Sequence, residues 1–310
     1  MRNIRFAFIA LFVLAAMSLC AQSNIDGEHI ELKKMGSHYV FSANINGVSE
    51  ATVLLESGIP AMLADSAFVF GKEVLSGLNL LPANGEKINL GGRILKISHK
   101  ASGVVKINDQ VSYKGEVFIL PDYTKDIAKG YEVALPVQHL HNNRDNGSRI
   151  VRLSLGDNSL MMLSKGSLRK QKDAYSKCKM NTKSYMSMPA LETEISMSYG
   201  GKLRVLKGNF NIDFGNPELV FLMDQHKDVQ QFLLENSDIE LKQARNPRGD
   251  VVAQFIFADQ CELCDMQFPN AVILITKNLP RFTTVGNIGL KFFKSNEAIF
   301  DFDRNVMYVK

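Results

Sequence analysis

The chain consists largely of short runs in which apolar and polar residues alternate, and this period of two predicts β-strands. Examples are 38–45, 104–107 and 116–120, which are rich in β-branched and aromatic residues. Turn dipeptides such as those at 46–47 and 84–85 bound these runs. The pattern therefore predicts a mainly β protein whose strands are joined by tight turns.

Helical periodicity is rare in this sequence. The best candidate is 224–236, where Val229 and Phe232 share one face and Asp224 is the predicted N-cap. A second, weaker helix is predicted after Asp65. Helices are therefore expected to be few and short.

Two segments, 53–60 and 210–217, repeat one pattern: an apolar strand, then acid-x-Gly, then a turn that ends in proline. Two hairpin patterns, 150–163 and 298–309, follow them at similar spacing. Each hairpin pattern has an alternating strand, a turn that contains asparagine and an apolar return strand. Two landmarks in the same order in both halves indicate an internal duplication.

The first 22 residues are predicted to be a signal peptide, so the protein is expected to be exported, to the periplasm or the cell exterior. Two arginines precede an apolar run at 6–17 that is too short to span a bilayer, and small residues follow it. Cleavage is expected near Ala21. The alternative is a lipid anchor on Cys20, which would tether the protein to a membrane.

Charge and motifs exclude several classes of function. The formal charge is +4 over 310 residues, two of the positive charges lie in the leader, and no basic field predicts nucleic-acid binding. No phosphate-binding glycine loop and no second apolar stretch of membrane-spanning length is present. His139 and His141 have strand-like spacing but no nearby carboxylate, which favours a surface strand or loop over a metal site. We expect no metal and no cofactor.

The pair Cys261 and Cys264 is compatible with a metal site, a redox pair or a local turn. A zinc site would need about two more ligands, and no second cysteine pair exists. The pair lies between two strand-like runs, which favours a local turn that a Cys261–Cys264 disulfide would close after export.

The segment 165–187 differs from its surroundings because lysine and arginine stand there among polar residues with few apolar anchors. This composition favours a solvated linker, with a basic surface for a partner as the alternative. The predicted domains are accordingly an N-terminal lobe at 23–164 and a C-terminal lobe at 188–310.

These repeated segments resemble the aspartic proteases of the pepsin and retropepsin type. Their signature is an apolar strand entering Asp-Thr/Ser-Gly, a later apolar segment with glycine, and a closing hairpin. In the second half, 212–217, 285–293 and 299–309 resemble these three parts. The first half is less similar: Glu56-Ser57-Gly58 stands at the signature, and 133–137 replaces the glycine-containing segment.

The resemblance implies a two-lobed double β-barrel with a pseudo-twofold axis and an extended peptide bound between the lobes. It also implies that Glu56 and Asp213 face one another as catalytic acids that share a proton around a water molecule. Ser57, Gly58 and Gly215 would support them, and the hairpin pattern at 88–94 would form a flap over the peptide.

Two residues differ from the signature, and they leave two hypotheses about function. Glu56 replaces an aspartate, and its extra methylene moves the carboxylate by about 1.5 Å where catalysis tolerates roughly 0.5 Å. Phe214 replaces the second hydroxyl residue and adds a bulky ring near the acids. The chain is thus expected to be either an aspartic endopeptidase or an inactive relative that binds a peptide or another ligand.

Overall fold

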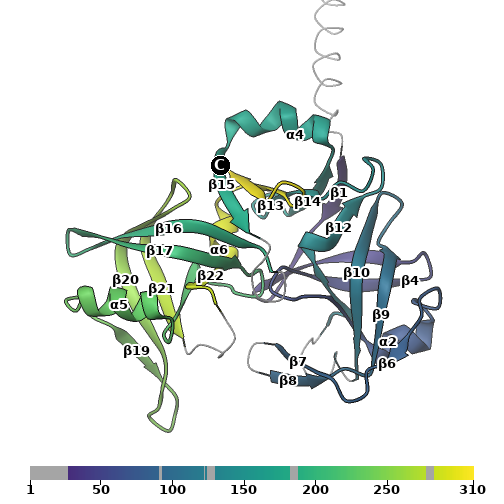
Figure 1. The fold of residues 1–310 in the computed structure, drawn as a ribbon, viewed down its shortest axis with the longest axis horizontal. Helices are drawn as coiled ribbons and strands as arrows, with labels where there is room; N and C mark the ends of the chain where they lie inside the picture. Colours follow the sequence, from purple (N-terminus) through teal and green to yellow (C-terminus); the bar gives the residue numbers. More distant parts are fainter. Residues whose placement is uncertain (1–26, 91–92, 122, 124–129, 182–187, 277–282) are drawn as a thin grey trace, which may run out of the picture.

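The computed structural model describes residues 27–90, 93–121, 123, 130–181, 188–276 and 283–310. It contains two β lobes joined by a shared sheet (Figure 1), and the expected mainly β architecture is confirmed. The predicted signal peptide and Cys20 lie outside the described residues. No helix in the described part of the chain has both the length and the apolar character to cross a membrane.

The first lobe is a nine-stranded sheet whose strands follow the order β2-β3-β4-β11-β5-β10-β9-β6, with β12 paired to β10. Its strands are β2 (Lys33–Met35), β3 (His38–Ile45), β4 (Ser49–Glu56), β5 (Met62–Asp65), β6 (Leu81–Pro82), β9 (His99–Lys106), β10 (Val111–Leu120), β11 (Val133–Pro136) and β12 (Leu140–Asn142). A separate hairpin, β7 (Lys87–Leu90) and β8 (Arg93–Lys96), lies beside this sheet. The predicted hairpin at 88–94 is thus present, and its tip at 91–92 lies outside the described residues.

The second lobe repeats the first in the order β16-β17-β22-β18-β21-β20-β19. Its strands are β16 (Ala190–Tyr199), β17 (Lys202–Ile212), β18 (Val220–Met223), β19 (Lys242–Arg245), β20 (Val251–Leu263), β21 (Met266–Thr276) and β22 (Gly286–Ile288). Strand directions also match, because β4 runs parallel to β11 and β17 runs parallel to β22. The two halves therefore share one topology, as the repeated sequence pattern predicted.

Six strands form the interlobe sheet, in the order β1-β14-β13-β23-β24-β15. They are β1 (Gly27–Glu31), β13 (Ile150–Ser154), β14 (Ser159–Leu163), β15 (Ser176–Asn181), β23 (Ala298–Asp301) and β24 (Val306–Val309). Both predicted closing hairpins are confirmed, as β13–β14 and β23–β24. They pair with each other through β13 and β23, with Val151 opposite Phe300, so the halves meet along related strands.

The predicted solvated linker is wrong for the described part of 165–187, which forms α4 (Lys165–Gln171), η2 (Lys172–Ala174) and β15. Strand β15 pairs with β24 in the interlobe sheet and with β16 in the second lobe. Cys178 and Met180 are buried, while Lys177 and Lys179 between and beside them are exposed. This alternation is a strand period hidden within a basic composition. The lobe boundaries at 23–164 and 188–310 remain predictions.

The short helices follow equivalent strands of the two lobes. Helix α2 (Ser66–Lys72) follows β5, as predicted, and the side chain of Asp65 caps it by accepting from two backbone N–H groups. Helix α5 (Lys227–Glu235) follows β18 and buries Val229 and Phe232. Its N-cap is His226 rather than the predicted Asp224, because a turn at 224–226 precedes the helix.

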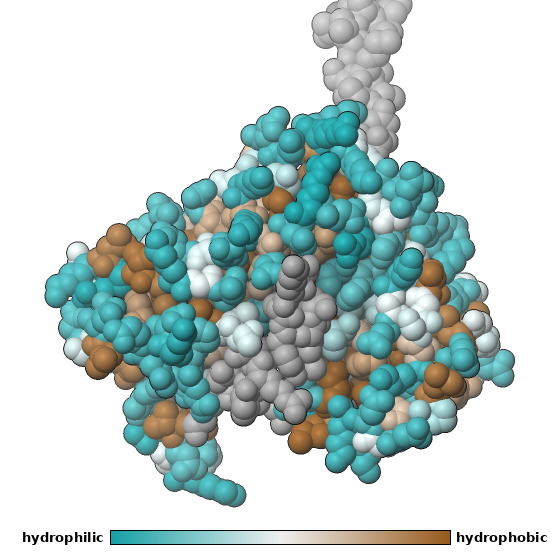
Figure 2. Space-filling view, in the orientation of Figure 1, coloured by the Kyte–Doolittle hydropathy of each residue, from teal (hydrophilic) through white to brown (hydrophobic). Residues whose placement is uncertain are grey.

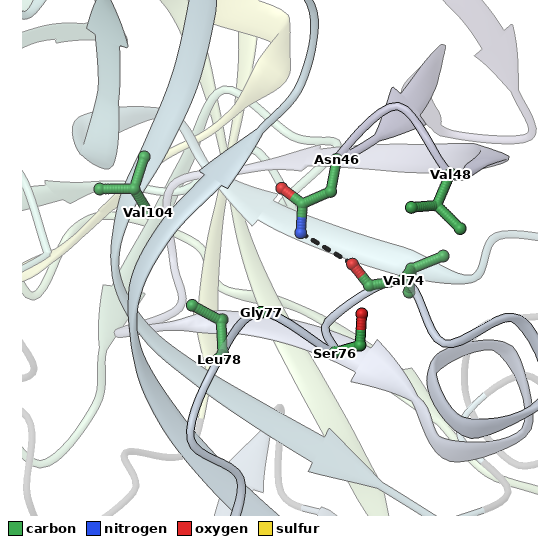
Figure 3. Close-up of a pocket in the computed structure, with 7 residues that line it drawn as sticks. All are labelled: Asn46, Val48, Val74, Ser76, Gly77, Leu78 and Val104. Atoms are coloured by element: carbon green, nitrogen blue, oxygen red, sulfur yellow. Dashed lines mark hydrogen bonds between the residues drawn. The ribbon is translucent and has the colours of Figure 1, made fainter.

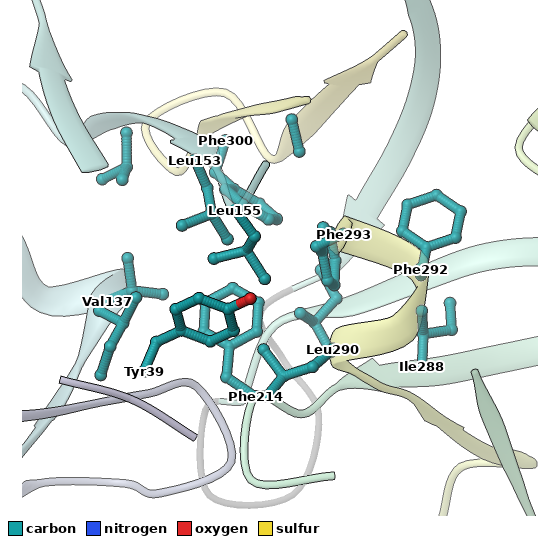
Figure 4. Packing of buried hydrophobic residues seen from close by; sticks show 14 of the residues in the cluster. Tyr39, Val137, Leu153, Leu155, Phe214, Ile288, Leu290, Phe292, Phe293 and Phe300 are labelled. Carbon is teal, nitrogen blue, oxygen red and sulfur yellow. The ribbon is translucent and has the colours of Figure 1, made fainter. Parts of the chain in front are cut away.

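Two further short elements, η1 (Val137–His139) and α6 (Leu290–Lys294), follow the equivalent strands β11 and β22. Aromatic and aliphatic side chains from both lobes pack beside them, beneath the interlobe sheet (Figure 4). We call this group the interlobe core; it comprises Tyr39, Val137, Leu153, Leu155, Phe214, Leu290, Phe293 and Phe300. The face in Figure 2 carries hydrophilic residues over α4, whereas hydrophobic residues form separate patches on both lobes.

Candidate active site

Two equivalent strands deliver the two acids. Glu56 is the last residue of β4, and Asp213 directly follows β17. The residues that precede them, Leu55 and Ile212, are buried, so hydrophobic burial fixes where each strand ends. We call residues 56–58 the first acid turn and residues 213–215 the second.

The carboxyl groups of Glu56 and Asp213 converge on one point. A methyl group built on Gly215 would lie 3.0 Å from Glu56 Oε1 and 3.1 Å from Asp213 Oδ1. A methyl group on Gly58 would lie 2.8 Å from Asp213 Oδ1. Each acid turn thus needs glycine because the carboxyl group of the other lobe occupies the space of a side chain.

Asp213 accepts hydrogen bonds from three groups of its own lobe. Asn287 Nδ2 donates to Oδ2 at 2.8 Å, and the N–H of Gly215 donates to Oδ1 at 3.0 Å. The N–H of Asn216 also donates to this carboxylate. Such donors stabilise the ionised form of a carboxyl group.

Glu56 is more deeply placed, with 8 % of its surface exposed, whereas Asp213 is partly exposed. The N–H of Ser57 donates to Glu56 Oε2 at 3.3 Å, and the N–H groups of Gly58 and Gly215 also donate to this carboxyl group. The donor on Gly215 belongs to the second acid turn, so one turn supports the acid of the other.

The pair is arranged to retain one proton at neutral pH. Burial and then the negative charge of Asp213 raise the pKa of Glu56 to about 8. Burial also raises the pKa of Asp213, but its hydrogen-bond donors and the nearby His38 act in the opposite direction. Because Asp213 is the more exposed acid and has a side-chain amide donor, it is the group that ionises first, and Glu56 holds the proton.

Ser57 connects the two acid turns. Its Oγ donates to the carbonyl of Ile212 at 2.9 Å and accepts from the N–H of Phe214 at 3.0 Å. The side chain is fully buried, so both backbone groups depend on it for a partner. The hydroxyl of the first turn therefore positions the backbone on either side of Asp213.

Phe214 stands where the second turn would carry the matching hydroxyl. Its ring points into the interlobe core, with ring centroids 5.3 Å from Phe293 and 6.0 Å from Phe300 (Figure 4). Both contacts are edge-to-face, the arrangement that aromatic pairs favour. Phe214, which the sequence analysis expected near the acids, is thus a core residue. The connection between the turns is one-sided, because only the first turn supplies a hydroxyl that bonds to the other turn.

A buried polar chain behind Asp213 was missed by the sequence analysis. Asn211 Nδ2 donates to Thr284 Oγ1 at 2.9 Å and lies 3.4 Å from Asn287 Oδ1, and Asn287 in turn donates to Asp213. The signal in the sequence was asparagine within otherwise apolar strand ends, as in Phe210-Asn211-Ile212. A polar residue at such a position is buried and needs a partner.

Gln138 on η1 was also missed. Its Nε2 donates to the carbonyl of Ile59 at 3.1 Å and lies 3.4 Å from the carbonyl of Ser57. Gln138 is buried, and these contacts fix the backbone that leaves the first acid turn. No local pattern links residue 138 to residue 57, because β11 must first pair with β4 to bring them together.

Tyrosines from the first lobe lie near Glu56. The charge of Glu56 contributes, after burial, to the raised pKa values of Tyr123 and Tyr131, whose ring centroids are 6.4 Å apart. Ile88 and Leu90 of the β7–β8 hairpin belong to the same apolar cluster as these rings. The hairpin therefore packs on the side of the first lobe that adjoins Glu56.

The histidine pair lies elsewhere in the first lobe. His139 contacts the ring of Tyr113, and His141 Nδ1 lies 2.8 Å from the carbonyl of Gly147. Within the described ranges, no group of three or more His, Cys, Asp or Glu side chains is placed to hold a metal ion.

A separate hollow of about 310 Å³ lies on the first lobe, between β9 and the chain after α2 (Figure 3). Asn46 contributes the side-chain amide to its wall. The Nδ2 of Asn46 donates to the carbonyl of Val74, and its Oδ1 accepts from the N–H of Lys106. Since Asn46 is already engaged within the fold, this hollow is a weaker candidate site than the paired acids.

Comparison with solved structures finds the same architecture in aspartic proteinases. The aspartic proteinase from Irpex lacteus has a TM-score of 0.53 and 10% identity, over 91% of this chain and 96% of that chain. A structure described as edgp has a TM-score of 0.53 and 11% identity, over 91% of this chain and 94% of that chain. No family model and no curated protein matches the sequence. At such low identity the likeness concerns the fold alone: the chain has the predicted two-lobed, pepsin-like fold.

Proposed function

We propose that this protein is an exported aspartic-type endopeptidase that cleaves extended peptides between its two lobes. The observation that carries the proposal is the convergence of Glu56 and Asp213 from equivalent turns onto one point. Burial and the charge of Asp213 raise the pKa of Glu56 to about 8, which favours a protonated Glu56 beside Asp213 at neutral pH. Two carboxyl groups that share a proton supply both the base and the acid that hydrolysis of an amide requires.

The environments of the two acids assign their roles. Asp213 is ionised and partly exposed, so it accepts a proton from a water molecule held between the acids. Glu56 is protonated, and it donates its proton to the carbonyl oxygen of the peptide as the water oxygen attacks the carbon. The product of this step is a neutral diol, and the proton has moved from Glu56 to Asp213.

Breakdown of the diol restores the starting state. Asp213 gives its new proton to the peptide nitrogen, which leaves as an amine, and Glu56 takes a proton from one hydroxyl as the carboxylic acid product forms. Each acid acts once as donor and once as acceptor, so no external proton is needed in a cycle.

The surroundings of the acids support an extended peptide as the substrate. Tyr123, Tyr131 and the β7–β8 hairpin form a largely apolar side near Glu56, and a bound peptide would lie between this side and the second lobe. The leader pattern at 1–22 supports export, which places the substrate in the periplasm or outside the cell.

A second candidate function is peptide binding without cleavage. The one-sided connection between the acid turns favours it, because Phe214 gives Ser57 no hydroxyl counterpart. The longer side chain of Glu56 favours it as well, since catalytic groups must be placed within roughly 0.5 Å. In this function the same residues would orient a ligand, and no bond would break.

Incubation with a diverse peptide mixture between about pH 3 and pH 8 separates the two functions. The parent protein is expected to cut, and Asp213→Asn and Glu56→Gln are each expected to lower the cleavage rate by roughly 100-fold or more. Asp109→Asn, at an exposed carboxylate in the turn between β9 and β10, is the matched control and should cut like the parent. Fragments that persist unchanged in both acid variants would refute the proposal. Binding of peptides without any fragments would support the second function.

A further inference from the structure

The cysteines of the second half are not arranged as their spacing suggested. Cys264 and Asp265 are the two central residues of the tight turn between β20 and β21, flanked by the paired Leu263 and Met266, so the predicted local turn is present. No Cys261–Cys264 disulfide closes this turn, because all three described cysteines are free thiols. Cys261 points into the core and is fully buried.

Cys264 instead contacts Cys178 on β15, which is distant in sequence. The Cys178 thiol donates a hydrogen bond to the Cys264 sulfur, and Thr193 Oγ1 lies 3.9 Å from the same sulfur. Pairing of β15 with β16 and of β16 with β20 brings the two cysteines together. Cys178 is 8 % exposed and Cys264 is partly exposed, so a small reagent reaches Cys264 first.

We propose that Cys178 and Cys264 form a redox-active pair that a small-molecule disulfide converts into an internal disulfide. The bond would fasten β15, which lies in both the interlobe sheet and the second lobe, to the turn between β20 and β21. This modification site is independent of the acid turns and of the proposed peptidase activity.

The hydrogen bond between the thiols assigns the order of reaction. It lowers the pKa of Cys264, which accepts, and raises the pKa of Cys178, which donates. The Cys264 thiolate attacks one sulfur of the small disulfide, forms a mixed disulfide and releases the other half as a thiolate. Cys178 then passes its proton to a departing thiolate and attacks the Cys264 sulfur, which releases the second half as a thiol. Two protein thiols are oxidised, and one small disulfide is reduced to two thiols.

Cys261 is excluded from this exchange by its surroundings. Burial raises the pKa of its thiol to about 12, so it holds almost no thiolate at neutral pH. The fold therefore selects a partner for Cys264 that is 86 positions away along the chain rather than the one three positions away.

The test is treatment of the folded full chain with oxidised glutathione, followed by digestion without reduction and peptide mass spectrometry. The expected product joins the peptides of Cys178 and Cys264 with the loss of two hydrogens. A disulfide that closes so long a loop should raise the Tm by several degrees, about 5 °C or more, relative to the reduced protein.

Three serine variants keep the test decisive. Cys178→Ser should stop at a stable glutathione adduct on Cys264. Cys264→Ser should give no adduct on Cys178 or Cys261 and no internal bond between them. Cys261→Ser should form the Cys178–Cys264 bond like the parent. A Cys261–Cys264 bond in the parent would overturn the proposal. A glutathione adduct on Cys264 that persists in the parent, without attack by Cys178, would also overturn it. The same holds if Cys264 stays unmodified in the folded chain but reacts fully in the unfolded chain.

Discussion

The two lobes share one order of strands, yet they surround their acids differently. In the first lobe, Leu54 and Ala134 lie opposite one another on β4 and β11, just before the acid. In the second lobe the equivalent pair is Asn211 and Asn287, on β17 and β22. The same backbone arrangement thus places an apolar residue pair behind the acid of the first lobe and a polar residue pair behind the acid of the second. We call these pairs the apolar and the polar backing.

The difference shows how a symmetric frame produces unlike acids. The second lobe has Phe214 where the first has Ser57, and it has an amide, Asn287, that donates directly to Asp213. The first lobe has the hydroxyl of Ser57, and Glu56 there receives backbone N–H donors alone among the contacts described. Polar backing favours the charged form of Asp213, and apolar backing favours the protonated form of Glu56.

Phe214→Thr should have the largest effect, because it gives the second acid turn a hydroxyl residue like that of the first and so removes a difference between the lobes. The change removes a ring that is 1 % exposed from the interlobe core, and we expect a loss of about 3–5 kcal/mol in the free energy of unfolding. Urea unfolding measures it. Phe257→Thr, at a ring that is 53 % exposed, is the control and should cost less than about 1 kcal/mol. Equal losses in the two variants would show that the ring of Phe214 is not a core anchor.

Glu56→Gln sharpens the comparison through pH. The pKa of Glu56 is raised from 4.5 to about 8 on folding, so the folded chain keeps a proton that the unfolded chain releases. The resulting stabilisation is complete below about pH 4.5 and is lost as pH rises toward 8, by up to about 1.4 kcal/mol per pH unit. Over the full shift from 4.5 to about 8, the total loss is on the order of 5 kcal/mol.

The measurement is the unfolding free energy of the parent and of Glu56→Gln between about pH 4 and pH 9. The parent should lose stability across this window, and the variant should lack that slope because an amide does not titrate there. A parallel pH dependence of both proteins would show that Glu56 does not retain the proton.

Ser57→Ala tests the one-sided connection between the turns. It leaves the carbonyl of Ile212 and the N–H of Phe214 without their side-chain partner, and we expect a loss of about 1–3 kcal/mol. Ser57→Thr keeps the hydroxyl and serves as the rescue variant. An alanine variant as stable as the parent would mean that other groups satisfy both backbone atoms.

Asn287→Ala gives the second lobe the residue that the first lobe has at position 134. Loss of the amide donor should raise the pKa of Asp213, because its ionised form loses a hydrogen bond. The acidic limb of the pH–rate profile for peptide cleavage should move upward by about one pH unit. Thr284→Ala, two hydrogen bonds beyond Asn287 along the same chain, should move it less. An unchanged limb in Asn287→Ala would remove Asn287 from the positioning of Asp213.

Local sequence patterns were sufficient for the features that depend on neighbouring residues. The acid turns, both closing hairpins and the helix behind Asp65 were predicted because apolar alternation and turn residues act over a few positions. The strand at 176–181 was missed because its two lysines lie within a basic, polar stretch and hide the alternation of its two buried residues. Only pairing with β24 and β16 gives those residues a core to enter.

Long-range contacts account for the other differences. The sequence paired Cys264 with Cys261 because three positions separate them, but the turn aims Cys264 toward β15. Asn287 and Gln138 went unnoticed because their partners lie on strands that meet only in the folded sheet. Such partners depend on strand register, and register is a property of the whole lobe.

Phe214 has a consequence that reaches beyond the fold. One peptide bond links it to Asp213, while Phe293 and Phe300 hold its ring from the far side. Substitutions at those two rings would change the packing beside Asp213 without altering a residue of either acid turn. Homologous chains that differ only at these core aromatic residues would therefore differ in the environment of Asp213. A comparison limited to Glu56 and Asp213 would not detect that difference.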